Sequence, residues 1–252
     1  MTVHFVGAGP GAVDLITLRG SRLIAAADVI IYAGSLVNPG LLESARADAR
    51  LHDSAKMTLD EIVTVIAEAE RRNETVVRLH SGDPSLYGAT HEQMRALDRL
   101  GIDYDTCPGV SSFSGAAAAL GIEYTVPERT QSVVITRMPG RTSMPEGEDV
   151  ASLARHGSTM VIFLSTGLLD GLASQLVAGG HDRCEPAAIV YKATWPDELV
   201  LTCTIGTLAA TARANGIEST ALIVVGPCLG ESQTVSRLYA DDFATGLREA
   251  RS

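Results

Sequence analysis

Short, continuous apolar runs recur along the chain, and they restrict its fold more than any other feature of the sequence. Each run is rich in β-branched residues and is bounded by turn-forming residues. Runs of this length without polar alternation are typical of strands buried on both faces, as in parallel sheets. They lie at Val3–Val6, Asp28–Tyr32, Thr75–Leu79, Ser132–Thr136, Thr159–Leu164, Ala187–Tyr191 and Ala221–Val225.

Helical patterns lie between several of these runs. Apolar residues at helical spacing predict a helix over residues 59–66, and Thr58 and Glu61 are placed to form a capping box at its start. A second helix is predicted over residues 90–100, ending at Gly101 as its C-cap. The alternation of strands and helices predicts an α/β protein with mostly parallel sheets.

The length of 252 residues allows one large domain or two small ones. Residues 121–129 are irregular and include Pro127, and the strand pattern restarts at Ser132. We therefore predict an N-terminal α/β domain over residues 1–122 and a C-terminal α/β domain over residues 123–252. Residues 138–149, rich in proline, glycine and charge, are expected to form a mobile loop in the second domain.

The formal net charge of −10 argues against nucleic acid or an anionic membrane as the main partner. A local basic cluster could still bind an anionic small molecule. No apolar run approaches the roughly 18 residues that span a bilayer, and no targeting segment is visible. The four cysteines contain no C-x-x-C pair and the six histidines no H-x-x-x-H pair. We therefore expect a cytoplasmic protein with reduced cysteines and no bound metal.

A glycine-rich loop, Gly7-Ala8-Gly9-Pro10-Gly11-Ala12, follows the first predicted strand. Its spacing matches the dinucleotide-binding fingerprint. Pro10 removes one backbone donor from the loop, however, and Asp28 begins its strand instead of ending it. A tight strand–helix turn explains the glycines equally well. An NAD-dependent oxidoreductase therefore stays open as an alternative that rests on this loop alone.

A second loop, Ser81–Gly88, follows the strand Thr75–Leu79. It lies at the carboxyl end of that strand, where open α/β sheets bind ligands. Gly82 lets the backbone approach a ligand closely and Pro84 fixes a turn, but a structural turn alone does not require Asp83 between them. We therefore predict a ligand site here, together with the strand-to-helix turn that ends in Ser111 and Ser112.

Four of these segments together resemble the tetrapyrrole methyltransferase family. They are the glycine loop followed by Asp14-Leu15-Ile16-Thr17, the Gly82-Asp83-Pro84 loop, the turn Pro108–Ser112 and the segment Ala221–Gly226. They occur in the family's order, and the resemblance covers essentially the whole chain. It implies two α/β domains with S-adenosyl-L-methionine in the cleft between them, S-adenosyl-L-homocysteine as the product, and a homodimer.

Three further stretches resemble the family members that methylate precorrin-4 at C11, giving precorrin-5 in cobalamin biosynthesis. They are residues 32–37, 136–142 and 191–198, the last of which holds the only tryptophan. The enzymes that methylate uroporphyrinogen III carry a catalytic Asp-Arg pair where Ala33 and Gly34 stand here, so the catalytic base stays unassigned. Methylation of cobalt-precorrin-4, methylation at another ring carbon, and a non-enzymatic tetrapyrrole-binding protein remain alternatives.

The resemblance also implies site residues. The cofactor contacts fall at Pro10, Ser81, Gly82, Asp83, Leu86, Ser111, Ser112, Thr166 and Ala193, with Thr166 in place of a methionine found in relatives. The acceptor is a polycarboxylate ring, whose carboxylates suit arginine forks and free backbone N–H groups. We expect Gly9, Gly11, Arg129, Arg137 and Arg141 to bind it, while a solvated loop is the competing interpretation of the arginines.

Overall fold

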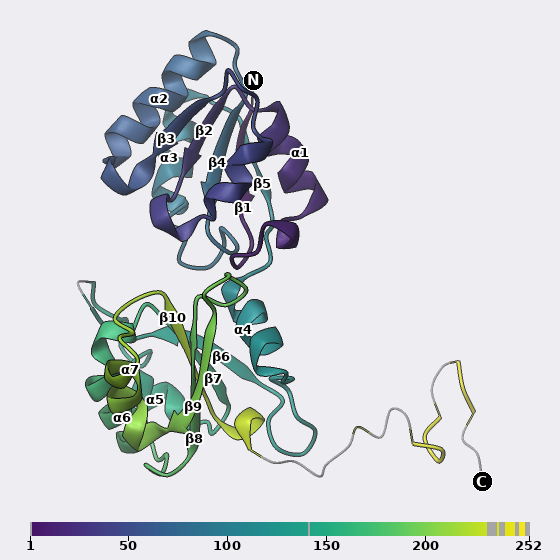
Figure 1. Ribbon diagram of the computed structural model, residues 1–252, viewed down its shortest axis with the longest axis vertical. Helices are drawn as coiled ribbons and strands as arrows, with labels where there is room; N and C mark the ends of the chain where they lie inside the picture. Colours follow the sequence, from purple (N-terminus) through teal and green to yellow (C-terminus); the bar gives the residue numbers. More distant parts are fainter. Residues whose placement is uncertain (1, 141, 231–235, 237–239, 245–246, 250–252) are drawn as a thin grey trace. The chain divides into compact units, whose positions relative to one another are not determined.

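The computed structural model describes residues 2–140, 142–230, 236, 240–244 and 247–249. The chain forms two compact units (Figure 1). The first unit comprises Met1–Ala119 and Lys192–Leu199, and the second comprises Leu120–Tyr191 and Val200–Ser252. The first break falls close to the predicted boundary after residue 122. The grouping of Lys192–Leu199 with the first unit had no counterpart in the sequence prediction.

The first unit contains a five-stranded sheet in the order β3-β2-β4-β1-β5. Every pair of neighbouring strands in it is parallel, which confirms the prediction for this sheet. Its strands are β1 (Val3–Gly7), β2 (Val29–Tyr32), β3 (Arg50–Asp53), β4 (Val76–His80) and β5 (Tyr104–Cys107).

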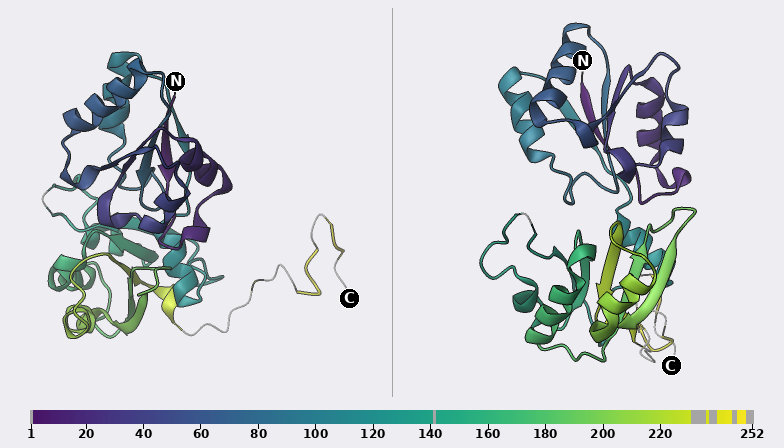
Figure 2. Two further views of the ribbon diagram at one scale, coloured as in Figure 1. Left: turned by 45° about the horizontal axis from the view of Figure 1, so that its top comes forward. Right: turned by 60° about the vertical axis from the view of Figure 1, so that its left-hand side comes forward.

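Helices cover both faces of this sheet (Figure 2, right). α1 (Leu18–Ala26) packs on one face, and α2 (Leu59–Arg71) and α3 (His91–Leu100) pack on the other. The predicted capping box forms, because Thr58 accepts from the Glu61 amide and Glu61 accepts from the Thr58 amide. Gly101 ends α3 in the left-handed conformation with φ of 66°, as predicted. α4 (Ser112–Leu120) follows β5.

The second unit contains a five-stranded sheet in the order β6-β7-β10-β8-β9. Its strands are β6 (Val133–Arg137), β7 (Thr159–Phe163), β8 (Pro186–Tyr191), β9 (Leu199–Thr204) and β10 (Ala221–Val225). Three helices, α5 (Val150–Ala154), α6 (Leu169–Ala178) and α7 (Leu208–Ala214), bury their apolar residues against one face of it.

The prediction of mostly parallel pairing is wrong for this second sheet. β6 and β7 are parallel, but β10 runs antiparallel to both β7 and β8. The reason lies in the connection from β8 to β9, since residues 192–198 are too few for the crossover of about a dozen residues that parallel neighbours need. The chain therefore reverses into β9. α7 then carries it back to β10, which runs antiparallel to β8.

Three strands had no apolar run in the sequence, namely β3, β5 and β9. Each of them lies at the edge of its sheet. Within the described ranges, no helix is both long and apolar enough to cross a membrane.

Candidate functional site

The loops after β1 and β4 leave the first sheet in opposite directions. β1 is followed by α1 and the route to β2, whereas β4 is followed by α3 and the route to β5, on the other side of β1. Such a point, at the carboxyl ends of neighbouring parallel strands, is where open α/β sheets bind ligands. The two loops are joined here, because Gly9 and Gly82 exchange backbone hydrogen bonds of 3.2 and 2.8 Å.

Glycines allow a third loop, the one after β5, to join them. A Cβ atom on Gly109 would lie 2.2 Å from the carbonyl oxygen of Gly82 and 2.7 Å from the Cα of Gly7. A Cβ atom on Gly82, whose φ is +61°, would lie 3.3 Å from the amide nitrogen of Ser112. The three loops therefore touch backbone to backbone, which only glycine at these positions permits.

Asp83 fastens the loop after β4 to the loop after β5. One carboxylate oxygen accepts from the amide of Gly109 at 2.8 Å, and the other accepts from the amide of Ser85 at 2.9 Å and from its hydroxyl. Partial burial opposes the charge, but the hydrogen bonds from Ser85 and Gly109 outweigh it and lower the pKa of Asp83. The carboxylate is therefore ionised and already bonded within the protein.

The hydroxyls of Ser81, Ser111 and Ser112 differ from Asp83 in this respect. Among the described residues, none of the three hydroxyl groups forms a hydrogen bond. They lie on the two loops that Gly82 and Asp83 hold together, so they can donate to or accept from a polar ligand. Leu86, one turn further along, is half-buried.

The glycine loop is held by two other segments of the first unit, one with Asn38 and one with Thr194 and Trp195. The indole N–H of Trp195 donates to the carbonyl of Pro10 at 3.2 Å, and Asn38 donates to the carbonyl of Gly11 at 2.8 Å. The hydroxyl of Thr194 accepts from the amide of Ala12 at 2.9 Å. Trp195 also fills the space beside Gly11, where a Cβ atom would lie 2.1 Å from its ring.

This arrangement argues against a dinucleotide on the glycine loop. A pyrophosphate would need free N–H groups at the start of a helix. The amides of Gly9 and Ala12 are already bonded, and Pro10 has none. α1 begins only at Leu18, where Thr17 caps it. The loop therefore lacks the donor geometry on which the NAD alternative depends.

Ala193 lies beside Thr194 and Trp195 in the segment Lys192–Leu199, and it is 5% exposed. Its neighbours Lys192 and Thr194 adopt positive φ of 46° and 69°. Non-glycine residues rarely take this conformation, and such strain concentrates at functional sites. Lys192 pairs with Asp197 at 2.6 Å, and its ammonium lies 5.7 Å from the Trp195 ring centre.

The other predicted site residues belong to the second unit. Thr166 follows β7, and its hydroxyl donates to the carbonyl of Ala221 at 3.3 Å. Leu164, also at the end of β7, has a φ of 52° and is 68% exposed. The carboxyl end of β7 therefore has a strained backbone at Leu164, as the segment 192–199 has at Lys192 and Thr194, but its strained residue is exposed.

The structure does not gather the predicted arginines into one cluster. Arg129 precedes β6 and Arg137 ends it, so the two lie at opposite ends of the strand. Arg137 donates to the carbonyls of Met138, Thr142 and Ser143 at 3.0, 3.3 and 3.0 Å, so its guanidinium already organises the turn that follows β6. Arg141 lies outside the described residues. Proximity in sequence was misleading, because a strand between two residues separates them.

Sequence analysis did not anticipate the residues that hold these loops, such as Asn38 and Thr194. Thr194 lies in the stretch 191–198 and Asn38 follows the stretch 32–37, but neither was given a role, because each acts through one hydrogen bond to a distant segment. In the described part of the chain, no three His, Cys, Asp or Glu side chains lie close enough to hold a metal ion.

Two α/β units, one with polar loops joined at a switch point of a parallel sheet, define a protein that binds a polar small molecule. Comparison with known proteins gives the family. The model of the Tetrapyrrole (Corrin/Porphyrin) Methylases matches residues 2–209. The chain therefore belongs to the tetrapyrrole methylases, and the resemblance inferred from the sequence is confirmed.

Individual relatives agree with this assignment. A precorrin-4 C(11)-methyltransferase of Rhodococcus erythropolis is 49% identical over 242 residues, covering 95% of this chain and 97% of the relative. The X-ray structure of a cobalt precorrin-4 methyltransferase superposes with a TM-score of 0.89 at 41% identity, covering 91% and 96% of the two chains. A uroporphyrin-III C-methyltransferase of Thermus thermophilus, solved with S-adenosylhomocysteine, gives a TM-score of 0.73 at 27% identity, covering 90% and 92%.

Proposed function

We propose that the protein transfers a methyl group from S-adenosyl-L-methionine to C11 of precorrin-4, forming precorrin-5 in cobalamin biosynthesis. Family membership and the precorrin-4 C(11)-methyltransferase relative support the reaction. One observation supports the cofactor site above all. The hydroxyls of Ser81, Ser111 and Ser112 have no hydrogen-bond partner among the described residues, and they lie on loops that are joined at the switch point. These hydroxyls suit the ribose and amino-acid groups of the cofactor.

The cofactor site comprises these serines with Gly82, Leu86 and the other residues that the family resemblance implies. Those others are Pro10, Asp83, Thr166 and Ala193. Asp83 is bonded to Gly109 and Ser85, so we assign it to holding the two loops together, with its negative charge favouring the cationic sulfonium at longer range. Leu86 offers the apolar surface that an adenine ring requires.

S-adenosylmethionine supplies an activated methyl group, so the chain needs no covalent catalyst. Its residues bind the acceptor carbon in line with that methyl group and exclude water. Arg129, Arg137 and Arg141 are proposed to bind carboxylates of the acceptor, with the backbone of Gly9 and Gly11 beside the ring. The enzyme is proposed to act as a homodimer in the cytoplasm.

The proposed cofactor site is tested with Gly82→Val. The valine would be strained at a φ of +61° and would press on Ser111 and Ser112. We expect a folded protein whose calorimetric affinity for S-adenosylhomocysteine is strongly reduced. Wild-type affinity in a folded variant would remove this loop from the site. NAD is titrated alongside, and heat of binding from NAD without heat from S-adenosylhomocysteine would favour the oxidoreductase alternative.

The substrate is tested by product analysis. Precorrin-4 and cobalt-precorrin-4 are each incubated with the enzyme and methyl-labelled S-adenosylmethionine, and NMR locates the new methyl group. Label at C11 supports the proposed reaction, and the faster of the two substrates identifies whether cobalt is present at this step. Label at another carbon would refute the C11 assignment.

A further inference from the structure

Arg78 is a buried cation in the centre of the first sheet. It lies in β4, with Ile31 of β2 and Phe5 of β1 beside it in register, and is 6% exposed. Burial lowers the pKa of Arg78 to about 10, so the side chain is still charged at neutral pH. Within the described residues its guanidinium forms no ion pair. Burying a charge without a counterion costs free energy, so a charged side chain at this position calls for a specific role.

The partners of Arg78 are neutral and lie where the strands end. One terminal nitrogen donates to the carbonyls of Ile31 and Leu79 at 3.2 and 3.4 Å, and Nε donates to the side-chain oxygen of Gln93 at 2.9 Å. The carbonyl of Leu79 also accepts from the amide of Ala33. Arg78 therefore links the carboxyl ends of β2 and β4. The cofactor loop, residues 81–90, begins at this end of β4.

Gln93 extends this connection into the cofactor loop itself. It lies in the first turn of α3, is 4% exposed, and its Nε2 donates to the carbonyl of Ala89 at 2.7 Å. The loop is strained at this end, since Tyr87 and Ala89 have positive φ of 54° and 49°. A Cβ atom on Gly88 would lie 2.3 Å from the carbonyl oxygen of Pro84, which shows how tightly the loop turns.

The hydrogen bonds that link Arg78, Gln93 and Ala89 need a middle group that both accepts and donates, which the amide of Gln93 does and a carboxylate cannot. Guanidinium only donates and a carbonyl only accepts, so the side chain between them must accept from one and donate to the other. Glutamate would neutralise Arg78, the usual way to stabilise a buried cation. It would also point an oxygen at the carbonyl of Ala89. Glutamine therefore leaves the charge of Arg78 without a counterion but makes the hydrogen bond to Ala89 possible.

We propose that Arg78 and Gln93 are positioning residues that hold residues 81–90 in their strained, cofactor-binding conformation. The proposal rests on the proposed function, in which this loop binds S-adenosylmethionine. Neither side chain touches the cofactor. They act through the carbonyl of Ala89 and through the strand ends from which the loop departs.

Gln93→Glu separates positioning from stability. The variant keeps a hydrogen-bonding partner for Arg78 and adds an ion pair, so we expect an unfolding temperature close to that of the wild type. The bond to Ala89 is lost. We expect about 5- to 30-fold weaker binding of S-adenosylhomocysteine and a matching rise in the KM for S-adenosylmethionine, with kcat within about twofold. Wild-type affinity in Gln93→Glu would overturn the proposal.

A second substitution makes the test specific for loop strain. Ala89→Gly removes the cost of a positive φ, so the loop needs less support from Gln93. In the Gln93→Glu background, Ala89→Gly should recover at least about threefold of the lost affinity. A structural role alone predicts no recovery, and that result would also overturn the proposal. If Gln93→Glu fails to fold, Gln93→Met, which fills similar volume without either bond, takes its place.

Gly82→Val distinguishes failure of this inference from failure of the proposed function. If Gly82→Val leaves the affinity for S-adenosylhomocysteine unchanged, the loop is not the cofactor site; the cofactor-site assignment and this inference then both fail, while product analysis decides on the reaction itself. If Gly82→Val weakens binding while Gln93→Glu does not, the cofactor site stands and only the positioning role is refuted.

Discussion

Replacing Asp83 with asparagine distinguishes a carboxylate that holds loops from one that contacts the cofactor. The carboxylate accepts from Gly109 through one oxygen and from Ser85 through the other. Asparagine has one acceptor oxygen, so its NH₂ group must face an N–H of either Gly109 or Ser85. One charge-assisted hydrogen bond is replaced by two opposed donors. Because a hydrogen bond to a charged group contributes about 1.5–3 kcal/mol, Asp83→Asn should lower the free energy of unfolding of the first unit by about 2 kcal/mol.

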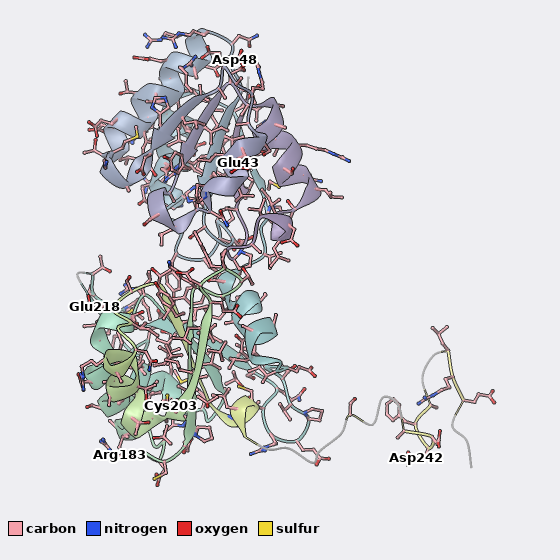
Figure 3. The ribbon with its side chains drawn as sticks, in the orientation of Figure 1. Glu43, Asp48, Arg183, Cys203, Glu218 and Asp242 are labelled. Carbon is pink, nitrogen blue, oxygen red and sulfur yellow. The ribbon has the colours of Figure 1, made fainter. Side chains whose placement is uncertain are left out.

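Urea unfolding and calorimetry with S-adenosylhomocysteine measure the two effects separately. Since the tie to Gly109 holds both serine-bearing loops, we expect cofactor affinity to fall about tenfold along with stability. Asp48→Asn is the matched control. Asp48 pairs with Arg46 at 2.7 Å before β3, at the opposite edge of the same sheet, and is exposed (Figure 3). Because this pair is exposed and screened by solvent, its loss should leave both the free energy of unfolding and the affinity for S-adenosylhomocysteine nearly unchanged. Full stability of Asp83→Asn with lost affinity would show that the carboxylate contacts the ligand and would refute this reasoning.

Three other substitutions test the remaining site. Trp195→Phe removes the indole donor to Pro10, worth about 1 kcal/mol, and should raise the KM for the tetrapyrrole about fivefold; because Pro10 belongs to the proposed cofactor site, the affinity for S-adenosylhomocysteine should also fall, but by less, and a larger fall would contradict the assignment of Gly9 and Gly11 to the acceptor side. Arg137→Ala should raise the tetrapyrrole KM roughly 10- to 150-fold, less so at high salt, whereas a rise only in the KM for S-adenosylmethionine would place Arg137 on the cofactor side. Burial, and then the charge of Arg78, lowers the pKa of His80 to about 3, so the folded state keeps it neutral while the unfolded chain takes up a proton below about pH 6.5. Its contribution to stability is therefore complete above that pH and is lost as pH falls, by about 2 kcal/mol between pH 7 and pH 5; urea titrations of His80→Asn should show a correspondingly shallower pH dependence, and an unchanged slope would exclude His80 as the cause.

The sequence predicted all the central strands and one edge strand, β6, and missed the other three edge strands. β10 is buried at every position and is apolar throughout, and β4 is equally buried and apolar except for Arg78 and His80. β5, with the sequence Tyr-Asp-Thr-Cys, is exposed at its central two positions, and β3 begins with exposed Arg50 and Leu51. One side of an edge strand faces solvent, where polar residues are tolerated, so an edge strand need not contain the apolar run on which the prediction relied. The mixed pairing of the second sheet was missed because the direction of a strand depends on the connection that leads to it and not on the residues of the strand itself.

The loops of the candidate site could be predicted, but the contacts that hold them could not. The strand–loop–helix order locates Ser81–Gly88 and Pro108–Ser112 at the carboxyl edge of one sheet, wherever the intervening chain goes. The bond from Asp83 to Gly109 depends on the order of the strands, since it requires β4 and β5 to flank β1. The hydrogen bonds from Arg137 to the carbonyls of Met138, Thr142 and Ser143 could not be predicted either, because they depend on how the turn after β6 folds back.

The glycine loop shows why motif spacing alone does not define a ligand. The same glycine pattern serves a pyrophosphate only if its amides point outward from a helix start. Here the amide of Gly9 bonds to Gly82, that of Ala12 bonds to Thr194, and Pro10 contributes no donor. A pyrophosphate would have to break two internal hydrogen bonds and displace Trp195 from Gly11, leaving the carbonyl of Pro10 without its donor. The hydroxyl groups of Ser81, Ser111 and Ser112, on the neighbouring loops after β4 and β5, form no hydrogen bond with any described residue. Glycines in the first loop therefore serve close packing, and the polar chemistry of the site is supplied by the loops that pack against it.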